Sequence, residues 1–342
     1  WMAKHEHQFG VVTKHAEDEI AAVCMAIGAN FVGARAMTAT SGGGFSLMVE
    51  ALGQAGICEV PLVLVEAQRG GPSTGLPTRT EQSDLLFVLH ASHGEFPRLV
   101  LAPGTIEECF ESGWRAFNLA EKYQTPVIIL TDQLLAASPR TVEVDDISFD
   151  QVVIDRGSLL SVDDLDDLDE PYKRHLLTES GISPRAIPGH RRAVYATASD
   201  EHDEFGHITE DMRNRVEMMQ KRMRKQEVSR QDIDPPTRYG PQEAEIVLAG
   251  WGSTYGVLRE VVDRLDGQAR LVHFRDLWPF PAEAAREALA GGRLVTVENN
   301  YTGQFKRLLQ SETCIQVDHE ILRYDGRPFD PEGVLVSLKE VQ

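Results

Sequence analysis

Apolar runs alternate with amphipathic stretches through the first part of this chain. Helices are predicted from residue 17, from residue 45 to about residue 55, and from Thr105, where Glu108 completes the spacing of a capping box. Buried strands are predicted over residues 35–40, 60–66, 99–101 and 126–132. Continuous apolar strands that alternate with helices are typical of a parallel sheet covered on both faces.

The pattern changes after about residue 145 and returns near residue 244. The acidic run 163–170 predicts a solvated linker, and residues 171–189 predict a segment that wraps the surface. A charged helix is predicted from residue 210 to 225. A second α/β unit then follows, with strands over residues 245–250, 270–274 and 293–298. We therefore expect an α/β protein with two doubly wound domains, residues 1–150 and 243–342, joined by an extended linker and surface helix over 151–242.

Composition narrows the possible partners. The chain has 342 residues and a formal net charge of −19, which disfavours nucleic acid as a partner. No apolar run reaches the length that spans a bilayer, so we expect no membrane association and a cytoplasmic location. The first residues read like a helix already under way, and we expect the natural chain to start further upstream.

Cysteine usage bears on metal chemistry. The cysteines at positions 24, 58, 109 and 314 form no CxxC pair. They are expected to be small buried residues in a reducing compartment, and this chain alone is not expected to hold an iron–sulfur cluster.

The most informative stretch is residues 67–80, AQRGGPSTGLPTRT, named here the arginine loop. It follows a predicted strand, and a parallel sheet places its ligands outside the carboxyl ends of its strands. Arg69 offers a planar fork suited to a carboxylate or phosphate, and Ser73 and Thr74 offer hydroxyl groups. The alternative is a solvated loop whose arginines pair with neighbouring acids.

Further polar features lie at other strand ends and helix starts. The acids at 17–19 suit a helix dipole, and the Ser41-Gly42-Gly43-Gly44 turn suits either an anion or a simple tight turn. His90 and His93 are expected near the same edge, where a structural role is the more common one. The sequence holds no catalytic triad, GxSxG, HExxH, Walker A or complete GxGxxG motif, so any demanding chemistry would come from a cofactor shared with another chain.

Several stretches in order along the chain resemble one family. They are residues 16–22, 36–48, 68–75, 116–123, 177–189 and 199–203, of which QRGGPSTG and GISPR are the most specific. The chain resembles the α subunit of the 2-oxoacid:ferredoxin oxidoreductases, and most closely the 2-oxoglutarate branch, 2-oxoglutarate synthase. In this family the residues 1–150 would form a pyrimidine-binding domain lacking its N-terminal part, and 243–342 a transketolase C-terminal-like domain.

The resemblance implies a cofactor, a reaction and partners. Thiamine diphosphate would be shared with a β subunit that carries Mg²⁺ and a [4Fe–4S] cluster, and this chain would bind no metal. The implied reaction is the reversible, coenzyme A-dependent oxidative decarboxylation of 2-oxoglutarate to succinyl-CoA and CO2, a reaction of the TCA cycle, with electrons passed to ferredoxin. A γ domain or subunit and an (αβ)2 assembly are also implied.

The resemblance carries roles to individual residues. Glu19 would hydrogen-bond the aminopyrimidine ring of the cofactor as the catalytic residue, and Arg69 would pair with the substrate carboxylate. Further contacts would come from Ser41 and Gly42 to the cofactor and from Ser73, Thr74 and His93 to the substrate. The family's Tyr-Pro-Ile-Thr-Pro-like motif is absent from this chain, and its Ser-Gly-Pro-Gly turn is Ser41-Gly42-Gly43-Gly44 here.

Two other functions stay open from the residues. One is a component of a different thiamine-dependent 2-oxoacid dehydrogenase or transferase that uses lipoamide, and the other is a non-catalytic scaffold subunit. The second carboxylate of 2-oxoglutarate would need its own partner, for which Arg79, Arg98 or a β-subunit residue are the candidates.

Overall fold

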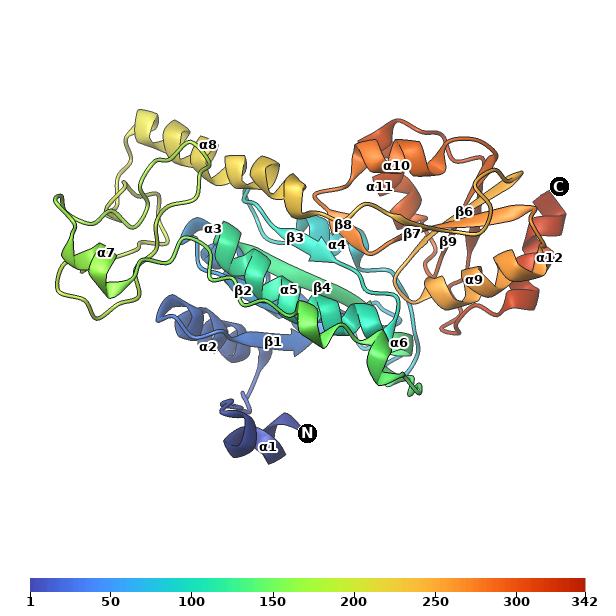
Figure 1. Ribbon diagram of the computed structural model, residues 1–342, viewed down its shortest axis with the longest axis horizontal. Coiled ribbons are helices and arrows are strands. Elements are labelled where there is room, and N and C mark those ends of the chain that lie inside the picture. The colour runs from blue at the N-terminus through green and yellow to red at the C-terminus, as the bar shows by residue number, and fades with distance from the viewer. Residues whose placement is uncertain (342) are drawn as a thin grey trace.

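A computed structural model describes residues 1–341 and contains two mainly parallel sheets, one in each half of the molecule (Figure 1). The first sheet has the order β1-β2-β4-β3-β8, with bounds β1 (Met37–Thr40), β2 (Leu62–Gln68), β4 (Pro126–Asp132), β3 (Leu99–Leu101) and β8 (Asp276–Trp278). Parallel pairs join β1 to β2, β2 to β4 and β4 to β3, and β8 adds an antiparallel edge beside β3. The expected strands of this half are thus confirmed: β3 and β4 have the predicted bounds, and β1 and β2 start two residues later than predicted.

Helices cover both faces of the first sheet. One face carries α2 (Glu19–Phe31), α3 (Gly42–Ile57) and α4 (Leu85–His90), and the other carries α5 (Ile106–Tyr123). The amino end of α5 is capped by Thr105, whose hydroxyl accepts from Glu108 N at 3.1 Å. The Glu108 carboxylate accepts from Gly104 N instead of completing the predicted box on Thr105. The short α6 (Gln133–Ala137) follows β4, and α1 (Met2–Phe9) lies apart from the sheets (Figure 1).

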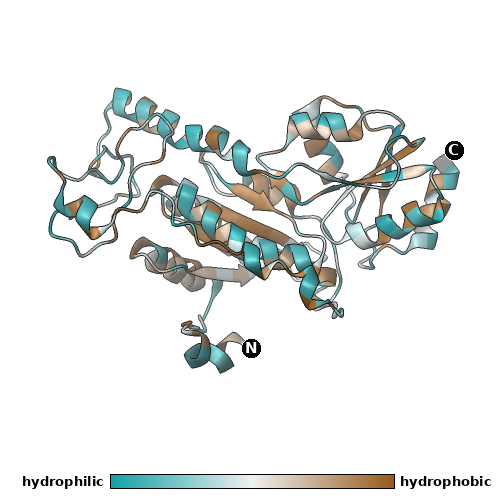
Figure 2. Cartoon of the chain, viewed as in Figure 1, coloured by the Kyte–Doolittle hydropathy of each residue, from teal (hydrophilic) through white to brown (hydrophobic). Residues whose placement is uncertain are grey.

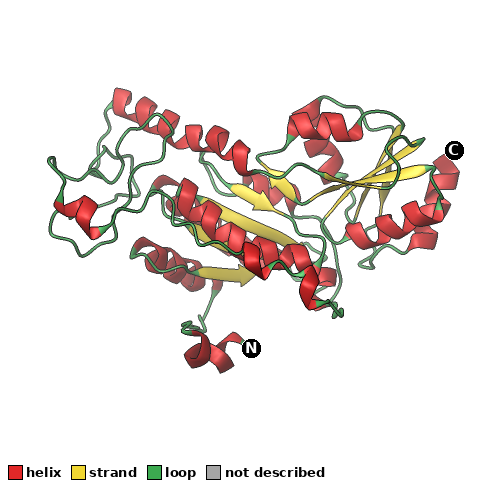
Figure 3. Ribbon diagram, viewed as in Figure 1, coloured by secondary structure: helices red, strands yellow, loops and turns green. Residues whose placement is uncertain are grey.

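A long excursion separates the two sheets in the sequence, and most of it is loop (Figure 3). Its helical elements are η1 (Val144–Asp146), η2 (Phe149–Gln151), α7 (Val162–Asp166), α8 (Met212–Val228) and η3 (Ser229–Asp232). The expectation of a solvated linker over 163–170 was wrong at its start, because Ser161 and Asp164 form a reciprocal capping box that begins α7. The predicted surface helix is confirmed as α8, which is mostly hydrophilic (Figure 2).

A buried ionic cluster attaches this excursion to the first sheet. It consists of Glu59, His175, Lys221 and Lys225. Lys221 Nζ lies 2.5 Å from Glu59 Oε1, His175 Nδ1 lies 3.0 Å from the same oxygen, and Lys225 Nζ contacts Oε2. Glu59 directly precedes the β2 region, so the cluster lies at the amino ends of the strands.

The second sheet has the order β10-β9-β6-β7-β5 and is parallel except for β5. Its strands are β5 (Thr237–Tyr239), β6 (Ile246–Trp251), β7 (Ala269–Phe274), β9 (Arg293–Glu298) and β10 (His319–Leu322). One face packs against α9 (Thr254–Arg264) and α12 (Pro331–Val341). The other packs against α10 (Ala282–Leu289) and α11 (Gln304–Thr313), which share a continuous core with α3 and α4 of the first half.

The two halves are interlocked. The strand β8 comes from residues beyond 243, yet it pairs with β3, with Val100 opposite Trp278. The α/β class with two sheets is confirmed, while the domain boundaries at residues 150 and 242 stay a prediction. Among residues 1–341 no helix combines the length and the apolarity needed to cross a membrane.

Candidate functional site

The carboxyl ends of β1, β2 and β4 meet at one edge of the first sheet, beside the second half of the molecule (Figure 1). The parallel register places Thr40 beside Glu66 and Gln68 beside Asp132. The Ser41 turn and the arginine loop leave the sheet at this edge, as the sequence predicted. Two of the expected site segments are therefore neighbours.

The amino end of α3 closely approaches the start of α2. A Cβ on Gly44 would overlap Thr40 Oγ1 and lie 2.8 Å from Glu19 Oε1. Only a glycine permits this approach, because any side chain at position 44 would displace the Thr40 hydroxyl or the Glu19 carboxylate. Glu19 thus lies against the first turn of α3.

The arginine loop approaches the same turn from the other side. A Cβ on Gly43 would lie 3.9 Å from the carbonyl oxygen of Ser73, and a Cβ on Gly42 would overlap the Asp84 carboxylate. Backbone N–H groups in the first turn of a helix have no partner inside the helix, so this turn is suited to an anionic or hydrogen-bond-accepting group.

Glu19 begins α2 after the N-cap Asp18, whose carboxylate accepts from Ala21 N at 2.8 Å. Because Asp18 caps the helix, the Glu19 carboxylate is not used for that purpose. Within residues 1–341 no group hydrogen-bonds or ion-pairs with the side-chain carboxylate of Glu19. Glu19 is partly exposed, so an external group can reach it.

The arginine loop folds as a short hairpin. Leu76 N donates to the Gly70 carbonyl at 2.7 Å, and Gly70 N donates to the Arg79 carbonyl at 3.2 Å. Ser73 and Thr74 lie exposed at the tip, while Arg69 is half-buried at the base. In the part of the chain that the structure describes, no acid pairs with Arg69 or Arg79, so the expected arginine–acid pairs of the alternative are not formed, although residues 71–79 are exposed.

An acidic layer that the sequence analysis did not include lies directly below the loop. Glu66 is fully buried, and within residues 1–341 neither of its oxygens has a hydrogen-bond donor. Burial and the neighbouring carboxylates of Asp84 and Asp132 raise its pKa well above the usual range. Burial also raises the pKa of Asp84 and of Asp132. A charged residue inside the apolar run 60–66 was the signal that could have identified this layer.

His93 lies away from this edge. Its neighbour Ser92 approaches the middle of α3, where a Cβ on Gly53 would lie 2.5 Å from Ser92 Oγ. Eleven residues of helix separate Gly53 from Gly42, or about 16 Å at 1.5 Å per residue. The structure thus brings Glu19, Ser41, Gly42, Arg69, Ser73 and Thr74 to one edge and leaves His93 at the far half of α3.

Arg98, one candidate for a second substrate carboxylate, is also unsuited to it. It is buried before β3, where it donates from NH1 to the Val88 carbonyl at 3.0 Å and lies over the Phe96 ring. Burial lowers its pKa to about 10. Arg79 remains exposed on the loop itself.

The cysteines and metal-binding groups can be placed as well. Cys58 is buried, but Cys24 and Cys314 are exposed, so the expectation of buried cysteines was wrong for these two. Among residues 1–341 no three His, Cys, Asp or Glu side chains gather in a manner that could hold a metal ion.

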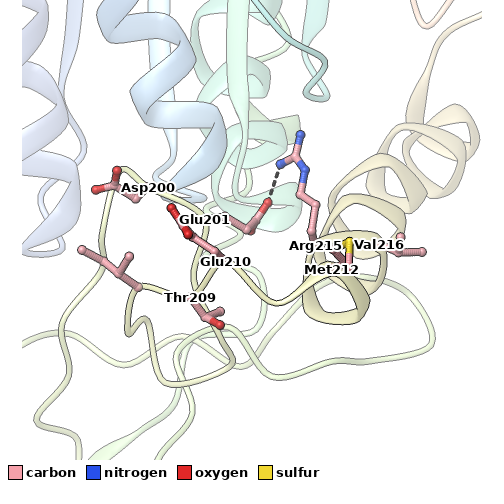
Figure 4. Close-up of a pocket in the computed structure, with 8 residues that line it drawn as sticks. Asp200, Glu201, Thr209, Glu210, Met212, Arg215 and Val216 are labelled. Atoms are coloured by element: carbon pink, nitrogen blue, oxygen red, sulfur yellow. Dashed lines mark hydrogen bonds and ion pairs between the residues drawn. The ribbon is translucent and has the colours of Figure 1, made fainter.

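A shallow hollow of about 550 Å³ lies elsewhere, between the start of α8 and the loop before it (Figure 4). Its lining combines the acids Asp200 and Glu210 with Met212 and Val216 of α8, and Arg215 pairs with Glu201 at its side. The same helix contacts Glu59, at the amino ends of the strands. The hollow is therefore separate from the edge that holds Glu19 and Arg69.

The geometry at that edge is suited to a small molecule with two kinds of polar group. Among residues 1–341, the Glu19 carboxylate has no partner and offers an acceptor, and Arg69 has no ion-pair partner and offers a cation that can bind a carboxylate bidentately. The glycine-rich turn between them offers backbone donors. No group in this set is a strong nucleophile, so the edge is suited to binding a ligand and to positioning a proton.

A family model and two curated proteins are similar in sequence to this chain. The sequence model of the family described as pyruvate flavodoxin/ferredoxin oxidoreductase, thiamine diphosphate-binding, matches residues 1–221. The chain is 46% identical over 323 residues to the α subunit of 2-oxoacid:ferredoxin oxidoreductase 1 of Sulfurisphaera tokodaii, covering 93% of this chain but 50% of that protein. It is 31% identical over 342 residues to the 2-oxoglutarate synthase subunit KorA of Archaeoglobus fulgidus, covering 99% and 88%.

A solved structure is also similar. The 2-oxoglutarate:ferredoxin oxidoreductase from Magnetococcus marinus, with 2-oxoglutarate, coenzyme A and succinyl-CoA bound, superposes with a TM-score of 0.89 at 36% identity. The match covers 99% of this chain and 59% of that chain. The chain therefore spans about half the length of the first of these curated relatives and somewhat more of the solved one.

Proposed function

The chain belongs to the 2-oxoacid:ferredoxin oxidoreductase α-subunit family, and from this premise we propose that it binds the pyrimidine ring of thiamine diphosphate and the carboxylate of 2-oxoglutarate. The proposed reaction is oxidative decarboxylation to succinyl-CoA and CO2, with electrons passed to ferredoxin. The observation that carries the proposal is the pair Glu19 and Arg69. Each lies at the ligand edge of the first sheet, and each lacks a side-chain partner within residues 1–341.

The residues present are suited to the proposed cofactor. An unpartnered carboxylate is the group needed to hydrogen-bond a protonated ring nitrogen, and Glu19 lies beside a turn that only glycine allows. When bound, thiamine diphosphate supplies the electron sink for loss of CO2. Glu19 would hold the pyrimidine ring through a carboxylate oxygen, and Ser41 and Gly42 would contact the cofactor at the first turn of α3.

Arg69 would bind the carboxylate next to the keto group. The Arg69 guanidinium is partly exposed and has no side-chain partner within residues 1–341, so an incoming carboxylate can bind it bidentately. The exposed hydroxyl groups of Ser73 and Thr74 would add weaker contacts from the loop tip. His93 is not included in this site.

The substrate and the partners are proposals as well. The 2-oxoglutarate branch is favoured by the similarity to the Archaeoglobus subunit and to the Magnetococcus structure, whereas the Sulfurisphaera relative is named for 2-oxoacids in general. We propose a β subunit that holds Mg²⁺ and the [4Fe–4S] cluster, a γ domain or subunit, a cytoplasmic location and an assembly of two αβ units.

The test is Glu19→Gln in the complex reconstituted with its partner subunits. We expect turnover of 2-oxoglutarate with a viologen acceptor to fall at least a hundredfold, because the amide cannot carry the charge that stabilises a protonated ring nitrogen. Glu17→Gln, two residues earlier and exposed, is the matched control and should retain the parent rate. Equal rates for the Glu19→Gln variant and the parent would remove the catalytic assignment.

The same preparation distinguishes the alternative functions. A brown complex that reduces viologen supports the ferredoxin-linked reaction. A colourless complex that requires a lipoyl protein would assign the chain to another thiamine-dependent 2-oxoacid dehydrogenase, and a complex without turnover of any 2-oxoacid would indicate a scaffold subunit.

A further inference from the structure

Gln82 lies between the arginine loop and α4, and it is fully buried. Its side-chain Nε2 donates to the Trp251 carbonyl at 2.9 Å, and its Oε1 accepts from Asn299 N at 3.0 Å. Its backbone N donates to the Asn299 carbonyl at 2.6 Å, and its carbonyl accepts from Asn300 Nδ2 at 3.0 Å. Both the backbone and the side chain of Gln82 are thus hydrogen-bonded to the second sheet.

The partners of Gln82 are themselves held firmly. Trp251 ends β6, and Asn300 follows β9, where it donates from Nδ2 to Glu298 at 2.7 Å and accepts from Gly303 N at 2.8 Å. Glu298 is buried and also accepts from two backbone N–H groups at the start of α11. These contacts form without the arginine loop, so they provide a fixed surface onto which the loop is bonded.

A second contact reaches the loop from the same half of the molecule. A Cβ on Gly326 would lie 2.8 Å from Leu76 Cδ1 and 2.9 Å from Arg79 Cβ. Asn299 Nδ2 donates to the Arg327 carbonyl at 3.2 Å, which ties this turn to the segment that binds Gln82. The hairpin that begins beside Arg69 is therefore bonded at its end and supported along its side by residues beyond 243.

We propose that Gln82 is a positioning residue through which the second half of the molecule holds the arginine loop in its ligand-binding geometry. This inference rests on the proposed function, because it assigns Gln82 to the binding of the 2-oxoacid carboxylate by Arg69. A bidentate ion pair depends on the direction of the guanidinium, so a loop that is released at position 82 should bind the carboxylate more weakly. The second half thereby contributes to substrate affinity although it lies outside the site itself.

Gln82→Met keeps the size of the side chain and removes both side-chain hydrogen bonds. In the reconstituted complex we expect the KM for 2-oxoglutarate to rise at least tenfold, with kcat within threefold of the parent and thiamine diphosphate affinity within twofold. A merely structural role would reduce the active fraction, which lowers kcat and leaves KM unchanged. Gln310→Ala is the control, because among the described residues the Gln310 side chain bonds only to Gln316, on the surface of the second half.

Gly326→Ala tests the second contact between the arginine loop and this half of the molecule, and it leaves Gln82 unaltered. The new methyl group would press against Leu76 and Arg79, and we expect a rise in KM of several-fold. Hydrogen exchange of the backbone amides in residues 70–79 provides a readout without turnover, and it should accelerate in both variants. Folded variants with parental KM values and parental exchange in this segment would overturn the proposal.

These experiments distinguish a failure of the positioning role of Gln82 from a failure of the proposed function on which it rests. A parent complex that turns over no 2-oxoacid would refute the proposed function, while exchange in residues 70–79 still decides whether Gln82 holds the loop. A parent complex with normal turnover and Gln82→Met at the parental KM would refute the positioning role alone.

Discussion

Changing Glu59 to Gln should strongly destabilise the attachment of the excursion to the first sheet. Glu59 is 0% exposed, and Lys221 and Lys225 are each 1% exposed against it. Burial by itself raises the pKa of Glu59, but the two ammonium groups outweigh that effect and hold it well below its usual range. The amide variant would leave two buried ammonium groups facing a neutral side chain.

The expected loss in the free energy of unfolding depends on whether the two lysines stay charged in the variant. Removing one partner of a buried ion pair typically costs about 3–5 kcal/mol. A buried lysine can instead lose its proton and become neutral. For a lysine with the ordinary pKa of 10.5, deprotonation at pH 7 costs about 5 kcal/mol, so the loss of stability from each unpaired lysine cannot exceed that figure. Burial already lowers the pKa of Lys225 to about 7, so this lysine responds at a smaller cost. We therefore expect a loss of about 3–5 kcal/mol for Glu59→Gln.

Urea unfolding at pH 7.5, followed by circular dichroism, measures this loss. Cleavage by a protease within residues 171–210 should also become faster, because this segment is held by the cluster. Glu260→Gln is the matched control, since its pair with Arg264 is largely exposed and should be worth less than about 1 kcal/mol. A Glu59→Gln variant within about 1 kcal/mol of the parent would refute the reasoning.

The pH dependence provides an independent check. The pKa of Glu59 is lower in the folded state than its unfolded value of 4.5, so its contribution is fully present above pH 4.5. It is lost as the pH falls below 4.5 toward the folded pKa. The difference between parent and variant should therefore shrink in acid, and a difference that grew there would contradict the assignment.

Three further predictions concern the ligand edge. Arg69→Met should lower kcat/KM for 2-oxoglutarate by about a hundredfold or more, equivalent to about 3 kcal/mol, and an unchanged value would discard its role in carboxylate binding. If Arg79 binds the second carboxylate, Arg79→Met should raise KM for 2-oxoglutarate but not for pyruvate, and equal effects on both substrates would exclude that role. Glu66→Gln should stabilise the chain at pH 7, because the raised pKa of Glu66 costs the folded state about 1.4 kcal/mol for each pH unit above 4.5. The gain in unfolding free energy should vanish near pH 4.5, and a gain that is independent of pH in urea titrations would contradict this reasoning.

Local patterns were enough to predict much of the architecture. The strands β2 and β4 are continuous apolar runs, and α5 begins at a threonine that caps it. These signals depend on neighbouring residues, so the sequence alone indicated the α/β class and the sheet edge at which we propose that ligands bind. The family resemblance added Glu19 and Arg69, which the structure brings to that edge.

Contacts between residues far apart in the sequence could not be predicted from local patterns. The strand β8 is three residues long and pairs with β3 from the other half of the molecule, so no local period indicates it. Glu59 and Lys221 are 162 positions apart, and Gln82 and Trp251 are 169 apart. Whether a charged or polar side chain is buried with partners depends on which distant segments fold against it.

The amino-acid sequence by itself therefore determined the kinds of elements, their order and the chemical groups offered at the ligand edge. The tertiary structure alone decided that the side chains of Glu19 and Arg69 have no partner within residues 1–341, that His93 lies elsewhere and that the second half contacts the arginine loop. Periodicity and capping are short-range effects carried by adjacent residues, whereas partnering and burial arise only when remote segments exclude water from the same space.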